Sequence, residues 1–237
     1  MHQIRKHNMK DVLITGASRG VGFALAKKFL DEGDRVICAS RNLKPLQKLL
    51  AQYGNRCVLV ELDLQSSTSI AAAFNAISLI SIQLNIVIHN AGALVNKEFA
   101  AISREELQMC YDVNVLGPYQ LTQKLLPILD KSAHLVFISS MGGYQGAQKF
   151  GGLTAYSSSK AAVASLTECL QEEFRESNFA FNCLCLGAIQ TEMLQNAFPG
   201  YQANLNPEQI SDYIYQFSTT ANRFLKGKII PVSLTTP

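Results

Sequence analysis

Short apolar runs alternate with longer stretches of helical periodicity along the whole chain. Seven runs have the length and composition of strands, at 11–15, 35–40, 57–63, 85–90, 134–140, 179–186 and 228–234. Helical patterns fill the gaps between them, at 22–33, 43–54, 67–80, 103–129, 154–176 and 207–222. The strand runs are apolar on both faces, so helices must cover both sides of the sheet. The alternation therefore predicts an α/β fold, a single-domain Rossmann-type doubly wound parallel sheet of about seven strands with helices on both faces.

Composition supports one compact domain over residues 1–237 and argues against two classes of partner. The hydrophobic fraction is 48% and the charged fraction 16%, below the usual share of about 25%. A net charge of +3, without a basic stripe interleaved with aromatic residues, does not favour a nucleic-acid partner. Because no run of 18 apolar residues exists, we expect no membrane span.

The ends and the cysteines indicate a cytoplasmic protein. The first ten residues are basic, but the apolar stretch of a secretory signal does not follow them, so residues 1–9 are predicted to be a frayed leader. The six cysteines form no C-x-x-C pair, and the four histidines do not group as metal ligands. We expect buried reduced thiols and no metal site. The stretch 64–96 has no Asp, Glu, Lys or Arg and is predicted to be a helix and a strand packed in a larger assembly.

The stretch "LITGASRGVG" (13–22) joins the first predicted strand to the first predicted helix. Gly16, Gly20 and Gly22 would let the backbone turn tightly there and let a pyrophosphate approach the helix N-terminus, where unpaired N–H groups favour an anion. A tight turn without a ligand explains one glycine but not three. The order of strand, loop and helix therefore favours dinucleotide binding, although the spacing T-G-x-x-x-G-x-G differs from the commoner G-x-G-x-x-G.

A tyrosine and a lysine lie four residues apart in "AYSSSK" (155–160), inside a predicted helix. Most such pairs are a packed tyrosine and a solvated lysine, but residues at this spacing share one helix face. A cation at about 4 Å in an effective dielectric of 20 is worth roughly 4 kcal/mol. Lys160 is therefore expected to lower the pKa of the Tyr156 phenol by up to about three units, which would make it a usable general acid or base.

With its other motifs, the chain closely resembles the short-chain dehydrogenases/reductases, from about residue 10 to residue 234. The resemblance is carried, in order, by "TGASRGVG" (15–22), "LDL" (62–64), "NAG" (90–92), "NVLG" (114–117), "ISSMGG" (138–143), "YSSSK" (156–160) and "LGAIQTEM" (186–193). The chain departs from the family pattern at Leu186, where proline is usual, and in a longer glycine-rich stretch at 143–153. We expect that stretch to be a mobile wall of the substrate pocket.

The resemblance implies catalytic roles for four residues. Tyr156 would exchange a proton with the substrate oxygen, and Lys160 would also hold the nicotinamide ribose. Ser140, rather than its neighbour Ser139, would hydrogen-bond the substrate oxygen. Asn114 would help to hold a water that links Lys160 to solvent.

Cofactor contacts follow from the same resemblance. Asp63 and its neighbour would lie by the adenine, although a helix-capping role for Asp63 stays open. The whole predicted cofactor site comprises Gly16, Ser18, Arg19, Gly20, Val21, Gly22, Ser40, Arg41, Asp63, Leu64, Asn90, Ala91, Gly92, Tyr156, Lys160, Ile189 and Thr191.

The end of the second predicted strand, "CASRN" (38–42), favours NADP(H) over NAD(H). A protein that binds NAD usually has an acidic residue there, which hydrogen-bonds the ribose hydroxyls. Here Ser40 takes that place and Arg41 follows, while Arg19 of the glycine loop is expected to approach the same pocket. Two solvated arginines remain the alternative.

These features together predict an NADP(H)-dependent oxidoreductase that interconverts a carbonyl and an alcohol, with Tyr156 as general acid/base. The alternative is a catalytically silent dinucleotide-binding sensor or scaffold. A methyltransferase would have no use for "YSSSK", and a sugar-nucleotide epimerase usually has another glycine spacing. Residues 187–207 are expected to form a substrate lid, whose apolar residues favour a fairly apolar carbonyl compound or simply pack a surface helix.

The predicted helices at 103–129 and 154–176 carry apolar residues on more than one side, including Leu121, Leu125, Val163 and Leu170. A wide core-facing stripe would explain them. In the family this helix pair commonly forms a subunit contact, so the resemblance implies a homo-oligomer, with a tetramer expected.

Overall fold

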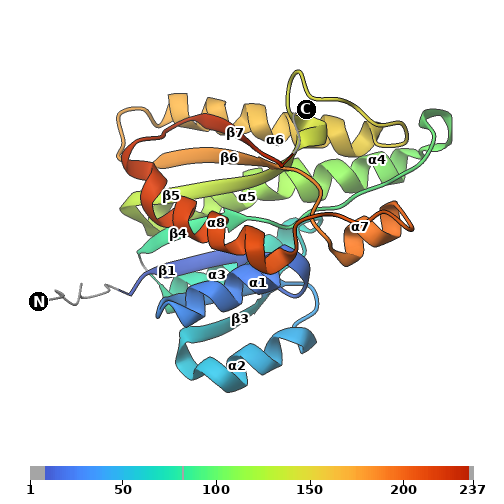
Figure 1. The fold of residues 1–237 in the computed structure, drawn as a ribbon. Helices are drawn as coiled ribbons and strands as arrows, with labels where there is room; N and C mark the ends of the chain where they lie inside the picture. The colour runs from blue at the N-terminus through green and yellow to red at the C-terminus, as the bar shows by residue number, and fades with distance from the viewer. Residues whose placement is uncertain (1–8, 82, 235–237) are drawn as a thin grey trace, which may run out of the picture.

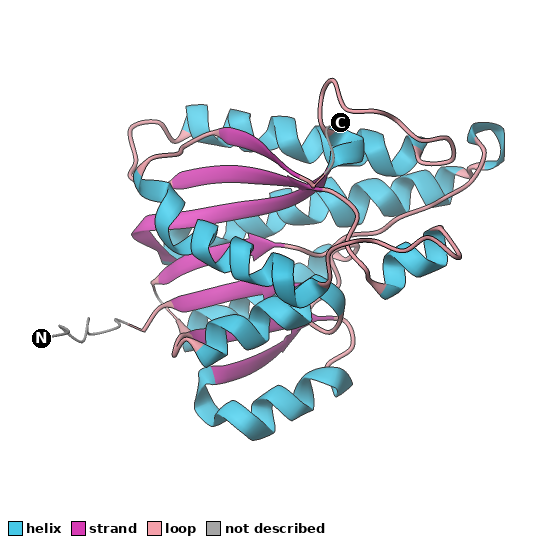
Figure 2. Ribbon diagram, in the orientation of Figure 1, coloured by secondary structure: helices cyan, strands magenta, loops and turns pink. Residues whose placement is uncertain are grey.

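The computed structural model describes residues 9–81 and 83–234, so the leader predicted at 1–9 lies, apart from Met9, outside the described residues. Within them, seven parallel strands form one sheet in the order β3-β2-β1-β4-β5-β6-β7 (Figures 1 and 2). The strands are β1 (Asp11–Thr15), β2 (Arg35–Ser40), β3 (Cys57–Glu61), β4 (Leu84–His89), β5 (Leu129–Ser140), β6 (Ala180–Leu186) and β7 (Lys228–Val232). The predicted doubly wound α/β fold is confirmed.

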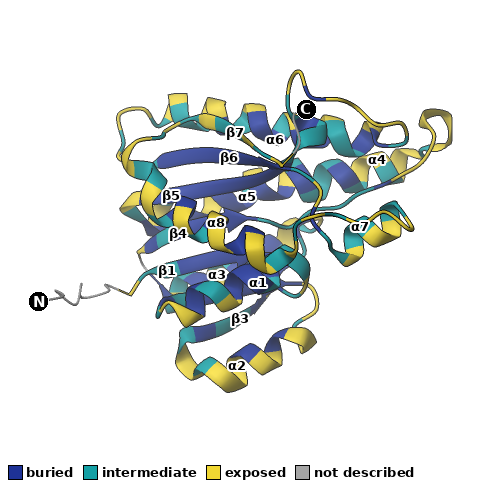
Figure 3. Ribbon diagram, viewed as in Figure 1, coloured by how far each residue is buried: buried dark blue, intermediate teal, exposed yellow. Residues whose placement is uncertain are grey.

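Helices cover both faces of the sheet and leave the strands buried between them (Figure 3). One face packs against α1 (Gly20–Asp31), α2 (Gln47–Tyr53) and α8 (Pro207–Thr220). The other packs against α3 (Ser67–Ile80), α5 (Gly117–Leu125) and α6 (Thr154–Glu173), and α4 (Arg104–Tyr111) packs on α6. The uncharged stretch 64–96 thus supplies a helix and a strand, as predicted. A short helix, α7 (Glu192–Ala197), lies apart from both layers at one end of the sheet (Figure 1).

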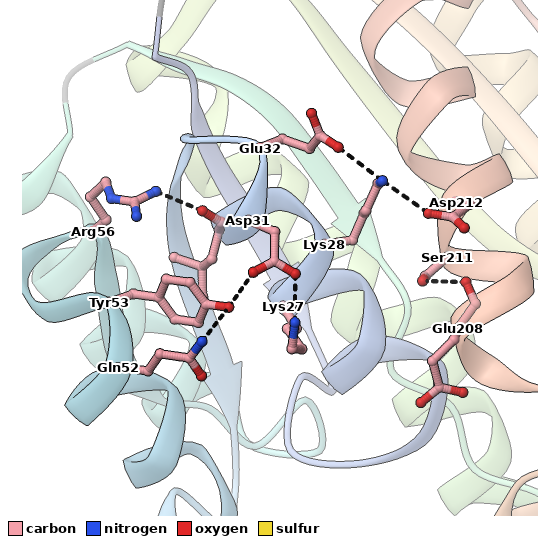
Figure 4. A network of polar contacts seen from close by, with 11 residues as sticks. Lys27, Lys28, Asp31, Glu32, Gln52, Tyr53, Arg56, Glu208, Ser211 and Asp212 are labelled. Carbon is pink, nitrogen blue, oxygen red and sulfur yellow. Dashed lines mark hydrogen bonds and ion pairs between the residues drawn. The ribbon is translucent and has the colours of Figure 1, made fainter.

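A polar network on the outer surface joins α1 to its neighbours (Figure 4). The Lys28 ammonium on α1 lies 2.9 Å from the Glu32 carboxylate and 3.0 Å from that of Asp212 on α8. Asp31 accepts a hydrogen bond from the Tyr53 hydroxyl of α2. These groups are partly exposed, so the buried apolar contacts beneath them contribute most of the stability of this layer.

The prediction of one helix over 103–129 is wrong, because the chain there changes its helical geometry twice. After α4 comes a π-helical turn, Asp112–Leu116, followed by α5 and a 3₁₀ turn at Leu126–Ile128. Close packing accompanies the change, since a Cβ on Gly117 would lie 2.5 Å from the Cβ of Leu64. Strand β5 then begins at Leu129, earlier than the predicted residue 134. Single π turns are frequent at functional sites, and this one carries Asn114.

The residues chosen from the sequence to mark a subunit contact lie in the core instead. Leu121, Leu125 and Val163 are buried in the layer between the sheet and helices α3, α5 and α6, and Leu170 packs against the same cluster. The wide core-facing stripe, the alternative explanation, accounts for them. The oligomer itself stays a prediction.

The two halves of the sheet diverge between β1 and β4, which pair with each other while the chain continues outward on either side. In open parallel sheets, ligands bind at such a switch point, outside the carboxyl ends of the strands. The glycine loop after β1 and the Asn90–Gly92 segment after β4 meet there. None of the described helices is both long enough and apolar enough to cross a membrane.

Candidate active site

A cleft of about 920 Å³ opens at the carboxyl edge of the sheet. Every residue predicted for the catalytic or cofactor site lines this cleft except Asn114. The structure therefore brings together predicted residues at or after the ends of six strands, β1 to β6, and at the start of α6. Within residues 9–81 and 83–234, no group of three or more His, Cys, Asp or Glu side chains could hold a metal ion.

Backbone geometry fixes the glycine loop against the end of β4. Gly16 and Gly20 have φ angles of +68° and +53°, in the left-handed region that favours glycine. A Cβ on Gly22 would lie 2.3 Å from the Gly16 carbonyl oxygen and 2.4 Å from the Asn90 Nδ2. Asn90 Nδ2 donates to the Thr15 carbonyl at 2.9 Å, and its own N–H donates to Thr15 Oγ1 at 3.1 Å. The loop is thus held by hydrogen bonds and by the space that glycine leaves.

The N-terminus of α1 fits a phosphate group. Arg19 stands at the N-cap position in extended conformation, and its side chain makes no capping hydrogen bond. Gly20, Val21 and Gly22, the first residues of the helix, all line the cleft. Their N–H groups have no intrahelical partner, and the helix dipole favours an anion in front of them. These residues, with the left-handed glycines, fit the pyrophosphate of a dinucleotide.

The outer end of the cleft carries hydroxyl and guanidinium groups. Ser40 Oγ, at the end of β2, donates to Ser18 Oγ of the glycine loop at 2.8 Å. Arg41 is exposed on the rim. Arg19 Nη1 lies 2.8 Å from Glu192 Oε2, at the start of α7. The sequence analysis did not predict a role for Glu192. No motif marks this residue, and its partner Arg19 is 173 residues away in the chain.

The alternative role for Asp63, capping a helix, does not hold for α3. Its Oδ1 accepts a hydrogen bond from Gln65 N–H at 3.0 Å, which closes a small turn. The N-cap of α3 is Ser66, whose Oγ accepts from Ser69 N–H at 3.2 Å. Asp63 therefore shapes the turn after β3 and faces the cleft.

Lys160 lies at the floor of the cleft and is only 4% exposed. Its Nζ donates to the Ile138 carbonyl oxygen at 2.8 Å, and burial lowers the pKa of its ammonium to about 8. Ser139 Oγ donates to the Lys160 carbonyl oxygen at 2.7 Å, so this hydroxyl supports the backbone of α6. Ser140 Oγ accepts from Gly142 N–H at 3.1 Å and also bonds the Tyr156 hydroxyl. Of the two serines, Ser140 is thus the one beside the phenol.

The expected lowering of the Tyr156 pKa is wrong for this structure. Burial raises the pKa of the phenol above its ordinary value, and the hydrogen bond with Ser140 only partly opposes this. The Lys160 ammonium lies 5.9 Å from the centre of the Tyr156 ring and is hydrogen-bonded to Ile138 instead. Sequence spacing gave the shared helix face correctly, but it could not reveal how deeply both groups are buried.

Asn114 lies behind the wall of the cleft. Its Nδ2 donates to the Ala93 carbonyl at 2.9 Å and to Ser159 Oγ at 2.8 Å, and its Oδ1 accepts from Ala93 N–H at 2.9 Å. A Cβ on Gly92 would lie 3.4 Å from Lys160 Nζ and 3.5 Å from Asn114 Oδ1. Asn114 therefore fixes the segment after β4 against α6, next to Lys160.

A model of the short chain dehydrogenase family matches residues 10–202. The chain belongs to this family. Oxidoreductase UcpA of Salmonella typhimurium (strain LT2) is 32% identical over 191 residues, which cover 79% of this chain and 72% of that protein. Membership makes the protein an oxidoreductase of the short-chain dehydrogenase family, as the motifs predicted.

Solved structures of short-chain dehydrogenases share the fold. One from Shigella flexneri 2a, complexed with NADP, has a TM-score of 0.86 and 28% identity, and the match covers 94% of this chain and 97% of that one. Another from Escherichia coli CFT073, complexed with NADPH, has the same TM-score and identity, with 94% and 96% covered.

Proposed function

We propose that this short-chain dehydrogenase is an NADP(H)-dependent enzyme that interconverts a carbonyl and an alcohol, with Tyr156 as general acid/base. The observation that carries the proposal is that Ser140, Tyr156 and Lys160 line the same cleft as the glycine loop. A silent sensor or scaffold would need the cofactor residues but would have no use for a hydroxyl pair beside a buried lysine.

The cofactor assignment rests on the cleft and on two relatives. The cleft fits a dinucleotide, with the α1 N-terminus for the pyrophosphate and Arg41 on the rim where an acid would repel a ribose phosphate. The relatives from Shigella flexneri and Escherichia coli, complexed with NADP and NADPH, support the phosphorylated form. A bound nicotinamide would supply or accept the hydride. Lys160 would hold its ribose, and Ile189 and Thr191 would contact its amide.

The protein residues manage the proton. Ser140 and Tyr156 would orient the substrate carbonyl by hydrogen bonds from two hydroxyl groups. Because burial raises the pKa of Tyr156, the phenol keeps its proton at neutral pH and can give it to the much more basic alkoxide. Lys160, with a pKa of about 8, is largely cationic at pH 7 and would stabilise the phenolate that remains. Alcohol oxidation would run the same proton transfer in reverse.

Replacing the phenol tests the proposal directly. Tyr156→Phe keeps the ring in its packed position but removes the proton donor, so we expect turnover of a substrate to fall by about 10³-fold. NADPH binding, followed by cofactor fluorescence, should change little. More than a few per cent residual activity would refute the acid/base role, while NADPH binding by an enzyme that reduces no member of a broad carbonyl panel would favour the silent sensor.

We also retain a single-domain homo-oligomer, with a tetramer as the expected state, and a cytoplasmic location. Exposed apolar residues support a subunit contact on the α4–α5 side, where Leu107, Leu116 and Tyr119 are 42 to 45% exposed. Five of the six cysteines are buried and all six are unpaired, which suits a reducing compartment. Light scattering at micromolar concentration tests the assembly, and a monomer mass would reject it.

A further inference from the structure

Three segments form the part of the cleft beyond Tyr156: the chain after β4 (93–98), the loop at 143–153 and the predicted lid at 187–207. Two contacts tie them together. Asn96 Nδ2 donates to the Ala197 carbonyl of the lid at 2.6 Å, and Lys97 N–H donates to the Gly152 carbonyl at 3.0 Å. The base of the lid is closed by Gln190 N–H, which donates to the Leu205 carbonyl at 2.8 Å. We call these three segments the substrate wall.

Gly152 shows how closely the substrate wall is joined. Its φ angle is +81°, and a Cβ on it would lie 2.1 Å from Asn96 Oδ1. Asn96 therefore occupies the space that glycine leaves while its amide reaches the lid. The long loop at 143–153 is thus packed against, and hydrogen-bonded to, the chain after β4.

The side chains that the substrate wall turns to the cleft are mainly apolar: Leu94, Phe150, Leu153, Met193, Phe198 and Tyr201. Phe150 and Tyr201 are 58% and 52% exposed, yet both line the cleft, so they form an aromatic rim at its mouth. Exposed aromatic side chains that line a concave site favour an apolar ligand that reaches the mouth.

Charged groups near the substrate wall are directed elsewhere. Lys97 pairs with Glu106 of α4, Lys149 Nζ donates to the Tyr144 carbonyl at 2.6 Å, and neither lysine lines the cleft. Glu192, the charged residue that the wall does contribute to the lining, pairs with Arg19 of the glycine loop.

The remaining charged residues that line the cleft, within the part of the chain that the structure describes, do not belong to the substrate wall. Arg41 and Asp63 stand at the ends of β2 and β3, and Lys160 is bound to the Ile138 carbonyl at the floor. A carboxylate or phosphate on the body of a substrate would therefore lose its water against apolar side chains without meeting a cation. Burying an unpaired charge in this way is strongly unfavourable.

We infer that the substrate is an uncharged, predominantly apolar carbonyl compound that extends from Ser140 and Tyr156 to the aromatic rim of Phe150 and Tyr201. The inference rests on the proposed carbonyl chemistry and adds the substrate class. It excludes keto acids and phosphorylated carbonyl compounds as good substrates.

A matched pair of ketones tests it with NADPH and the full chain. The neutral probe is 4-phenylbutan-2-one, and the charged probe is 4-(3-oxobutyl)benzoic acid, which differs by one para carboxylate. We expect kcat/KM to be about a hundredfold higher for the neutral ketone, because the carboxylate must be desolvated against the wall. Equal or higher efficiency with the acid would overturn the inference.

Two variants sharpen the test. Phe198→Arg places a cation on the substrate wall and should shift the ratio of efficiencies at least about tenfold toward the acid. Lys149→Gln is the control: its side chain is turned away from the cleft, so the ratio should stay as in the wild type. A ratio that moves with Lys149→Gln but not with Phe198→Arg would show an anion site at the rim and contradict the apolar assignment.

Binding separates this inference from the proposed function. Saturation-transfer NMR on the enzyme with NADP⁺ reports contact of either ketone without turnover. If neither ketone is reduced but the neutral one alone binds, the carbonyl chemistry is wrong and the substrate class stands. If the acid binds as well as the neutral ketone, the substrate class is wrong whatever the chemistry.

Discussion

The two walls of the cleft are held together by different kinds of structure. The cofactor wall consists of strand ends and the glycine loop, and hydrogen bonds between side chains and the backbone, such as those that join Asn90 to Thr15, hold it together. The substrate wall consists of loops that meet from distant parts of the chain, as when Asn96 bonds Ala197, 101 residues away. In the cofactor wall, the pairing of β1 with β4 brings the bonded residues together, whereas no strand pairing positions Asn96 against Ala197 in the substrate wall. One wall is therefore suited to a constant ligand and the other to a variable one.

The largest contrast should appear when a methyl group is added to one glycine of each wall. In Gly22→Ala the new Cβ meets the Gly16 carbonyl at 2.3 Å, so the loop or α1 must move and we expect a loss of about 3 kcal/mol in the free energy of unfolding. Gly151→Ala meets nothing within 4 Å and should change stability by less than about 0.5 kcal/mol. Urea denaturation measures both, and equal losses would mean that the glycine loop is no more closely packed than the chain at Gly151.

The same distinction explains what the sequence could predict. Strand and helix alternation and the parallel sheet follow from local periodicity, whereas the lining of the cofactor wall was predicted from motifs that resemble those of the short-chain dehydrogenases/reductases. The break at Asn114 and the depth of Tyr156 depend on tertiary packing, and they were not predicted. The pairing of Arg19 with Glu192 and the contact of Asn96 with the lid join residues far apart, for which the motifs contain no signal.

The next effect concerns the outer end of the cofactor wall. Arg41→Asp puts an acid where a ribose phosphate would lie, so the ratio of kcat/KM with NADPH to that with NADH should fall by about a hundredfold. Lys44→Asp makes the same charge change nearby, on a residue that does not line the cleft, and should alter the ratio little. A wild type that prefers NADH, or an unchanged ratio in Arg41→Asp, would contradict the assignment.

A smaller effect is expected where the two walls meet, at Lys160. Its pKa falls from 10.5 to about 8 on burial, so the unfolded chain holds this proton more tightly. The resulting destabilisation is fully present below pH 8 and disappears as the pH rises to about 10.5. Lys160→Met removes that penalty, which the lost hydrogen bond to Ile138 partly offsets. We expect the inactive variant to be about 2 kcal/mol more stable than the wild type at pH 7.

Urea denaturation of Lys160→Met and of the wild type at pH 7 and pH 10 checks the direction in which their stability difference changes with pH. The advantage of Lys160→Met should shrink at the higher pH, and an advantage that grows there would mean that burial does not penalise the ammonium. Lys131→Met, on an exposed residue of β5, controls for the general effect of losing a cation.

The smallest effect compares two asparagines, one in each wall. Asn90→Ala removes the hydrogen bond to the Thr15 carbonyl and loosens the glycine loop, so the Kd for NADPH should rise by about fivefold. Asn96→Ala releases the lid at Ala197, so the KM for the ketone should rise by a similar factor while the Kd for NADPH stays constant. The two sites act on different ligands, and their effects should add in the double variant, since they share no partner. If Asn96→Ala weakens NADPH binding as much as Asn90→Ala does, the lid is part of the cofactor wall as well. The ion pair between Glu192 of the lid and Arg19 of the glycine loop would then explain how the lid affects NADPH.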